Sequence, residues 1–333
     1  MTKQQATNMT PLTAEELCFF KQYGYLLKSK AVAKSACELA LDRMWATAPA
    51  GVKRDDPSTW KPISEAEQSN DPLLIKQDTR WQLRAASTEA QIIELAYNRQ
   101  ICAWAEQLLG RESLKEPKID GKPMGSWGTA WPGGPVDPAL GEGVRGIYAT
   151  LPWDKSQPVP PNSLHTDGHP FHLGAVCLLA DNPPGGGGFK VWPGSHRRFY
   201  PLFPMQYDQA RIPFYEHMPS LKGIIHPAAY LTAVRDVEAD TPPVDCYGKA
   251  GDLVFWHHRL GHMAGINICE PPCIRQALLF DFCRKELDTM RLDPPQEDMW
   301  RDWGAELKAA DVPVTRQLAA EQRLPLALAE QLG

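Results

Sequence analysis

The chain has 333 residues, of which 43% are hydrophobic, and a formal net charge of −5 at pH 7. This length allows a large core, and because β-barrels often run this long as one domain, we expect a single domain over residues 1–333. The mild acidity argues against nucleic acid or an anionic membrane surface as the main partner. No apolar run approaches the roughly 20 residues of a membrane span.

The cysteines and the N-terminus indicate where the protein resides. The eight cysteines are scattered, and only Cys269 and Cys273 lie close together. This spacing is typical of reduced thiols in a cytosolic protein rather than of a disulfide framework. The opening MTKQQATNMT lacks the apolar region of a signal peptide. We therefore expect a cytoplasmic protein.

Residues 1–115 are predicted to be mainly helical. Thr13 and Glu16 have the spacing of a capping box, and the helix they begin ends at Gly24. Tyr25–Leu27 is then predicted to be a strand at the edge of a barrel. A second helix is expected over 31–48, where apolar residues recur at helical spacing.

The remainder of this part is predicted to contain a loop and a longer helix. Residues 50–72 are rich in Pro, Lys and Asp, which indicates a loop or an insertion. The longer helix is expected over 88–109, with Thr88 and Gln91 as its cap and a buried apolar stripe. Nothing in that stripe requires a cofactor.

Residues 116–284 are predicted to form a core of strands, followed by an extension over 285–333. Strands are expected over 144–153, 171–180 and 222–226, and a further insertion over 228–244. The glycine run 185–188 lacks the Lys and Ser/Thr of a phosphate loop, so a turn between strands is expected there.

His165 and Asp167 are the first candidate metal ligands. They lie two residues apart in an extended stretch, so their side chains point to the same side and offer a nitrogen and an oxygen to one metal ion. A third ligand is expected from the stretch Gly251–Phe282. Two histidines and one carboxylate leave three coordination positions open, a pattern associated with non-haem Fe(II) oxygenases. Several other histidines compete for these roles: His169, His172, His257, His258 and His262.

Three groups of residues are candidate contacts for anions or substrate. Arg275 opens an apolar strand, so its guanidinium is expected to be partly buried, to need an anion, and to hold a carboxylate through two parallel hydrogen bonds. Arg80, together with Arg84, and Arg197 are weaker candidates for an anionic group of a substrate, and exposure to solvent is the alternative for each. Trp127 and Trp131, in the loop 117–143, are candidates for a pocket lining, and simple packing is an equal alternative.

In combination these segments resemble the phytanoyl-CoA dioxygenase-like branch of the Fe(II)/2-oxoglutarate-dependent oxygenases. The matching pieces are LTAEELCFFKQYGYLL at 12–27, HTD at 165–167, WPGSHRR at 192–198, GDLVFWHH at 251–258, LGHMAGIN at 260–267 and IRQALLFDF at 274–282. The resemblance implies a single catalytic domain of mainly β structure with flanking helices. Its core would be a double-stranded β-helix (a cupin-like jelly roll) over 116–284 that carries the ligands.

The resemblance also implies the roles of the site residues. His262 stands at the LxHxxxxN position and completes an Fe(II) site with His165 and Asp167. Arg275 would anchor the distal carboxylate of 2-oxoglutarate; weak candidates for a second contact are Tyr148, Thr150 and Ser195. The implied reaction consumes O2, converts 2-oxoglutarate to succinate and CO2, and oxidises a C–H bond of a small molecule. Asp167 stands where the related halogenases have a small residue, which implies hydroxylation.

Two functions of other classes stay open. One is a non-catalytic metal-binding jelly roll, against which Arg275 argues, because a bare metal site needs no co-substrate anchor. The other is a zinc-dependent hydrolase, for which no Glu near either ligand motif offers a base. The substrate, the choice between monomer and homodimer, and the role of residues 285–333 (wrapping the barrel, a dimer contact or an active-site cover) also stay open.

Overall fold

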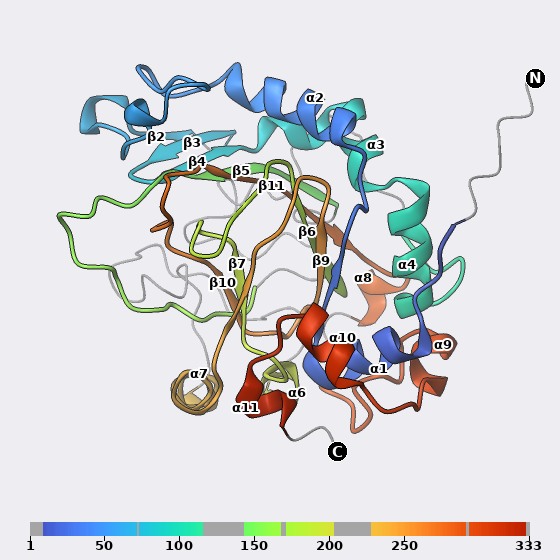
Figure 1. Cartoon of the computed structure of the whole chain (residues 1–333). Helices are drawn as coiled ribbons and strands as arrows, with labels where there is room; N and C mark the ends of the chain where they lie inside the picture. Colours follow the sequence, from blue (N-terminus) through green and yellow to red (C-terminus); the bar gives the residue numbers. More distant parts are fainter. Residues whose placement is uncertain are drawn as a thin grey trace, which may run out of the picture.

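Two antiparallel sheets surrounded by helices form the framework of the protein (Figure 1). The computed structural model describes residues 9–71, 73–115, 143–167, 171–202, 228–290 and 293–330. Within these residues the large sheet has the order β1-β9-β6-β11-β5-β4-β3-β2, and the small sheet has the order β10-β7-β8. The predicted strand over 222–226 lies outside the described residues.

The strands of the large sheet, in sheet order, are β1 (Tyr25–Lys28), β9 (Leu253–His257), β6 (Leu173–Leu178), β11 (Arg275–Phe282), β5 (Val144–Thr150), β4 (Arg80–Leu83), β3 (Leu74–Gln77) and β2 (Ser69–Asp71). Those of the small sheet are β10 (His262–Ala264), β7 (Phe189–Val191) and β8 (Val244–Cys246). The strands predicted over 144–153 and 171–180 are therefore confirmed as β5 and β6.

The inner faces of the two sheets pack on each other. The ring of Phe189 on β7 lies 4.7 Å from that of Trp256 on β9, and Trp256 in turn lies 5.6 Å from the ring of His262 on β10. This is the arrangement of a double-stranded β-helix, so the predicted fold class is confirmed. The glycine run 185–188 forms the turn between β6 and β7, as expected.

Helices cover the outside of the large sheet. The N-terminal ones are α1 (Ala14–Tyr23), α2 (Lys34–Trp45), α3 (Ala90–Ala96) and α4 (Arg99–Leu109). The capping box of Thr13 and Glu16 is present, and Gly24 ends α1 with a left-handed backbone (φ 78°). In Figure 1, α2 and α3 lie along the outer side of the large sheet, as an amphipathic helix does when it buries its apolar stripe.

The single helix predicted over 88–109 is wrong, because the structure divides it into α3 and α4. The side chain of Asn98 accepts a hydrogen bond from the backbone N–H of Ile101 and starts α4 as an N-cap. Asn competes with the helix for backbone donors, so it favours such a break. Glu89 rather than Thr88 precedes α3, and it makes no side-chain cap.

A three-stranded meander widens the large sheet beyond the β-helix. The loop predicted over 50–72 is confirmed for 50–68, which are largely irregular with short 3-10 turns at Pro57–Thr59 and Glu65–Glu67, and is wrong for Ser69–Asp71, which form β2. The chain then forms β2, β3 and β4, which pair in sequence and join the sheet through β5. The N-terminal part therefore contributes strands as well as helices.

The C-terminal segment wraps the N-terminal helix and protects the edge of the large sheet. It contains α8 (Leu287–Met290), α9 (Ala305–Ala309), α10 (Arg316–Glu321) and α11 (Leu326–Ala329), and α9 and α10 contact α1. The side chain of Gln322 accepts from the N–H of Leu27 on β1 at 2.6 Å and donates to its carbonyl at 3.0 Å. These bonds satisfy an edge strand that would otherwise be open to pairing. In the described residues, no helix is both long and apolar enough to cross a bilayer.

Candidate metal centre

The segment that carries His165 and Asp167 is extended and lies between β5 and β6. Its middle residue, Thr166, turns away and binds the hydroxyl of Tyr230 through its N–H (2.8 Å) and its own hydroxyl (3.1 Å). Tyr230 belongs to α7 (Ala228–Asp240), a helix where the sequence predicted only an insertion over 228–244. The side chains of this segment therefore alternate in direction, as expected of an extended chain, and α7 packs against the side opposite to the two candidate ligands.

His262 begins β10 and faces His165 across a β-bridge. The N–H of His165 donates to the carbonyl of His262 at 3.1 Å, and the N–H of His262 donates to that of His165 at 2.9 Å. Their rings are 4.8 Å apart. The backbone itself thus holds the two imidazoles side by side.

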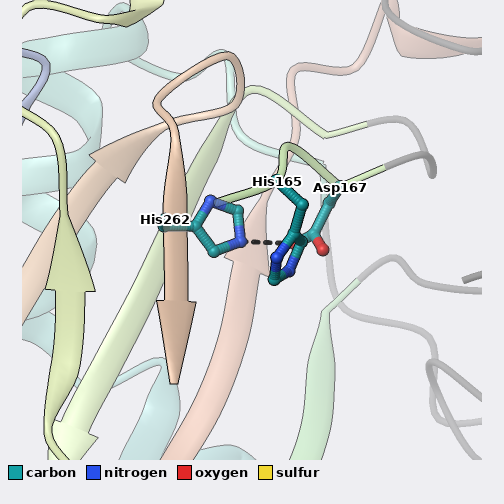
Figure 2. A group of neighbouring side chains, drawn as sticks. All are labelled: His165, Asp167 and His262. Carbon is teal, nitrogen blue, oxygen red and sulfur yellow. Dashed lines mark ion pairs between the residues drawn. The ribbon is translucent and has the colours of Figure 1, made fainter. Parts of the chain in front are cut away.

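The three predicted ligands converge, as Figure 2 shows. One ligand atom from each of His165, Asp167 and His262 lies within 4.8 Å of the others, and Nε2 of His262 is 3.5 Å from Oδ2 of Asp167. In the described part of the chain this is the single group of His, Cys, Asp or Glu with such a geometry. Asp167 and His262 are buried, whereas His165 is half-buried.

Hydrogen bonds determine which nitrogen of each histidine is available. Nδ1 of His165 lies 3.0 Å from the carbonyl oxygen of Ser163, and Nδ1 of His262 lies 2.8 Å from that of Leu260. A carbonyl oxygen only accepts, so both Nδ1 atoms carry the proton and each Nε2 keeps its lone pair. Two imidazole nitrogens and a carboxylate form a donor set that fits Fe(II) and other divalent transition metals. The residues present therefore fit the iron implied by the sequence.

Arg145 contacts this group, although the sequence did not point to it. It lies on β5, its Nη1 donates to Oδ2 of Asp167 at 2.7 Å, and its Nε and Nη2 donate to the two oxygens of Asp281 at 2.8 and 2.6 Å. Asp281 lies on β11 next to β5, and all three side chains are buried. The two carboxylates hold the pKa of Arg145 above its usual value, against the opposing effect of burial.

Arg275 begins β11 and is paired with Thr150 of β5. Its side chain is buried, and its Nε donates to the carbonyl of Gly187 at 3.1 Å. Burial lowers the pKa of the guanidinium to about 10, which still leaves it charged at neutral pH. It forms no ion pair with any carboxylate in the described ranges. Asp245 lies near enough for its charge to raise the pKa of Arg275 against the effect of burial, but no hydrogen bond or ion pair joins the two side chains.

Tyr148 and Thr150 flank Arg275, whereas Ser195 does not. Tyr148 is close enough to raise the pKa of Arg275, and Thr150 is the residue paired with Arg275 across the strands. The carbonyl of Thr150 accepts from Nδ2 of Asn267 at 3.0 Å. The hydroxyl of Ser195 donates to the carbonyl of Trp192 and accepts from the N–H of Gly261, next to His262. Ser195 thus secures the turn behind His262.

The competing histidines lie together, apart from the ligand group. His257 stacks on His258 at 4.3 Å and on Trp303 at 5.0 Å, under the C-terminal segment. Nδ1 of His172 accepts from the N–H of Arg284 at 3.2 Å, and its Nε2 lies 3.3 Å from the sulfur of Met290. His169 is outside the described residues.

The weaker candidates for substrate contacts occupy different places. Arg80 is exposed at the start of β4, and Arg197 is exposed beside the carbonyl of Lys21 at the end of α1. Arg84, just past β4, lies 5.9 Å from the ring of Tyr148. Trp127 and Trp131 fall in residues that the structure does not describe.

One comparison with known proteins identifies a family. Residues 20–272 match the family model of phytanoyl-CoA dioxygenase (PhyH). No curated protein matches the chain. Among solved structures, the chain is similar to EctD from S. alaskensis with bound Fe, at 16% identity over 90% of this chain and 85% of that chain, with a TM-score of 0.47. It is also similar to the non-heme alpha ketoglutarate dependent carbocyclase SnoK from nogalamycin biosynthesis, at 17% identity over 88% and 98%, with a TM-score of 0.42.

Proposed function

Because the chain belongs to the phytanoyl-CoA dioxygenase family, we propose that it is an Fe(II)/2-oxoglutarate-dependent dioxygenase that hydroxylates a C–H bond of a small molecule. The observation that carries the proposal is the convergence of His165, Asp167 and His262 within 4.8 Å, with Nδ1 of each histidine hydrogen-bonded to a backbone carbonyl. Family members use this set for iron, and three ligands leave room for a co-substrate and O2.

The bound iron would supply the redox chemistry that couples loss of CO2 from 2-oxoglutarate to oxidation of the substrate. The protein's own residues supply the geometry. The bridge between His165 and His262 fixes the spacing of the imidazoles, and the carbonyls of Ser163 and Leu260 fix their orientation. Such outer contacts tune a metal site as much as the ligands themselves do.

Arg275 is the proposed anchor for the distal carboxylate of 2-oxoglutarate. It offers a buried guanidinium without an ion pair in the described residues, and its planar fork matches a carboxylate. Tyr148 and Thr150 lie beside it on β5 and are the proposed neighbours of the co-substrate. A zinc hydrolase or an inert jelly roll would have no use for this cation.

The substrate is proposed to be a small molecule with an anionic group. Gln82 of β4 is paired with Tyr148 of β5, so the two side chains share a face of the sheet. Arg84 lies at the end of this row, donates to the side chain of Gln82 at 3.1 Å, and forms no ion pair with a described residue. A carboxylate or phosphate of the substrate would complete this site.

The test compares two arginines. We expect the wild-type protein to form succinate from 2-oxoglutarate in the presence of Fe(II). The variant Arg275→Ala should raise the KM for 2-oxoglutarate at least about tenfold, because a charge-assisted hydrogen bond is lost, and it should still bind Fe(II). Arg111→Ala, which removes an exposed arginine paired with Glu306, is the control and should keep the wild-type KM. An unchanged KM in Arg275→Ala would move the anchor elsewhere.

A further inference from the structure

We propose that Arg145, held by Asp281, is a positioning residue that fixes the carboxylate of Asp167 in the orientation in which it binds the metal. The inference rests on the proposed metal centre and adds two residues to it. Neither Arg145 nor Asp281 offers an atom to the three-ligand group. Their effect would pass through Asp167 alone.

The hydrogen bonds around Arg145 divide into an anchor and a free arm. The carboxylate of Asp281 accepts hydrogen bonds from Nε and Nη2 of Arg145 at 2.8 and 2.6 Å. This bidentate pairing fixes the plane of the guanidinium. The remaining nitrogen, Nη1, is thereby directed at Oδ2 of Asp167, 2.7 Å away. The direction of this arm is therefore set by Asp281 and not by Asp167.

The anchor belongs to the paired strands of the large sheet, whereas Asp167 does not. Arg145 and Asp281 lie on β5 and β11, which are paired in the middle of the large sheet, and the N–H of Asp281 donates to the carbonyl of Gly143 at 2.8 Å. Asp167 lies in an extended segment outside the regular strands. A contact from the sheet to this segment is what makes the position of its carboxylate reproducible.

Burial keeps the contact from being replaced by water. Arg145 and Asp167 are each 5% exposed, and Asp281 is 1% exposed. The guanidinium lies 5.0 Å from the ring of Phe171 and 5.6 Å from that of Trp256. Rotation of the Asp167 carboxylate would break a charge-assisted hydrogen bond where no solvent compensates for it. Trp256 also lies beside His262, so the same indole ring contacts both Arg145 and one of the metal ligands.

The test uses Co(II) as a spectroscopic stand-in for the metal, with the full-length protein. Asp281→Asn keeps the size of the side chain and removes the charge that orients Arg145. Arg145→Lys keeps a cation near Asp167 but cannot hold both carboxylates with one planar fork. For each variant we expect the dissociation constant for Co(II) to rise about 10- to 100-fold and the visible d–d absorption of the bound Co(II) to change.

A matched control separates positioning from general destabilisation. Glu16→Gln removes an ion pair remote from the ligand group, the partly buried pair of Lys28 with Glu16 between α1 and β1. It should lower the melting temperature and leave the Co(II) affinity and spectrum as in the wild type. Circular dichroism shows which variants are folded. If Asp281→Asn does not fold, Arg145→Lys is the variant that tests the inference.

Each outcome decides a different point. Weaker binding with an altered spectrum in a folded variant supports the inference. Wild-type affinity and spectrum in folded Asp281→Asn and Arg145→Lys would overturn it and leave the network a purely structural one. Failure of the wild-type protein itself to bind Co(II) would instead overturn the proposed metal centre, and the inference with it.

Discussion

The position of single protons decides what the histidines of the centre can bind. At His165 and His262 the carbonyl of the residue two positions earlier accepts a hydrogen bond from Nδ1, which leaves Nε2 as the nitrogen that can bind a metal ion. The histidines under the C-terminal segment differ in their hydrogen bonding, as His257 shows. Nδ1 of His257 accepts from the N–H of Arg259, and its ring is enclosed by other aromatic rings.

This difference gives a prediction about metal stoichiometry. His262→Ala should abolish turnover and lower the affinity for Fe(II), because one of three ligands is lost. His257→Ala should keep close to one metal per chain, although it removes a buried side chain and so lowers stability. Metal content after dialysis, measured by atomic emission, checks both. Loss of the metal in folded His257→Ala would show that the ligands are wrongly assigned.

The ligands could be predicted from the sequence, whereas their support could not. His165 and Asp167 are two residues apart, and that spacing alone places both side chains on one side of an extended chain. Arg145 is separated from its partners Asp167 and Asp281 by 22 and 136 residues. A lone arginine in an apolar strand carries no periodic signal, so only the pairing of β5 with β11 reveals its contacts.

At the scale of elements, a glycine allows β6 and β9 to bring a tryptophan next to the centre. Gly174 is paired with Trp256, and a Cβ added at Gly174 would come within 2.2 Å of the indole ring. The indole therefore lies directly over the glycine backbone, where it also borders His262 and Arg145.

We expect Gly174→Ala to destabilise the protein by about 1–3 kcal/mol, the usual cost of overpacking, and to weaken metal binding by displacing Trp256. Urea denaturation and Co(II) titration measure the two effects. Gly51→Ala is the control: Gly51 has φ +79° and open space around it, so it should cost about 1 kcal/mol of backbone strain without any effect on the metal. Equal effects of the two substitutions on metal binding would contradict this role of Gly174.

Helices and strands with a strong sequence pattern could be predicted, and those with weak apolar periodicity could not. The capping box and the glycine that ends α1 are local signals, and both are present. The helix α7 was not predicted, because it buries only Tyr230 and Val237 among its residues and its apolar period is weak. The meander β2–β4 consists of strands of three or four residues, which is too short for alternation to be visible.

At the scale of the whole molecule, the C-terminal segment encloses a group of histidines that folding keeps neutral. His172 and His196 are both buried, and burial lowers the pKa of each to about 3, from an ordinary value of 6.5. The unfolded chain therefore binds protons near pH 6 that the folded chain does not bind until about pH 3. Stability should fall as the pH drops from about 6.5 towards 3.

The size of this effect is measurable. At pH 5 each of these histidines should reduce the free energy of unfolding by about 2 kcal/mol relative to neutral pH. Urea denaturation of the chelator-treated protein at pH 7 and pH 5 gives the difference, and His196→Gln should make it smaller by about that amount. The same difference in both proteins would show that His196 does not titrate on unfolding.

We propose that one site of the protein binds both iron and 2-oxoglutarate. Anaerobic titration of the purified protein with Fe(II) and then with 2-oxoglutarate, followed by visible absorption, tests it most directly. We predict a weak charge-transfer band that appears only when both are present, and that is lost in His262→Ala. Absence of the band in the wild-type protein, together with tight binding of zinc, would contradict the claim and favour a hydrolase or an inert jelly roll.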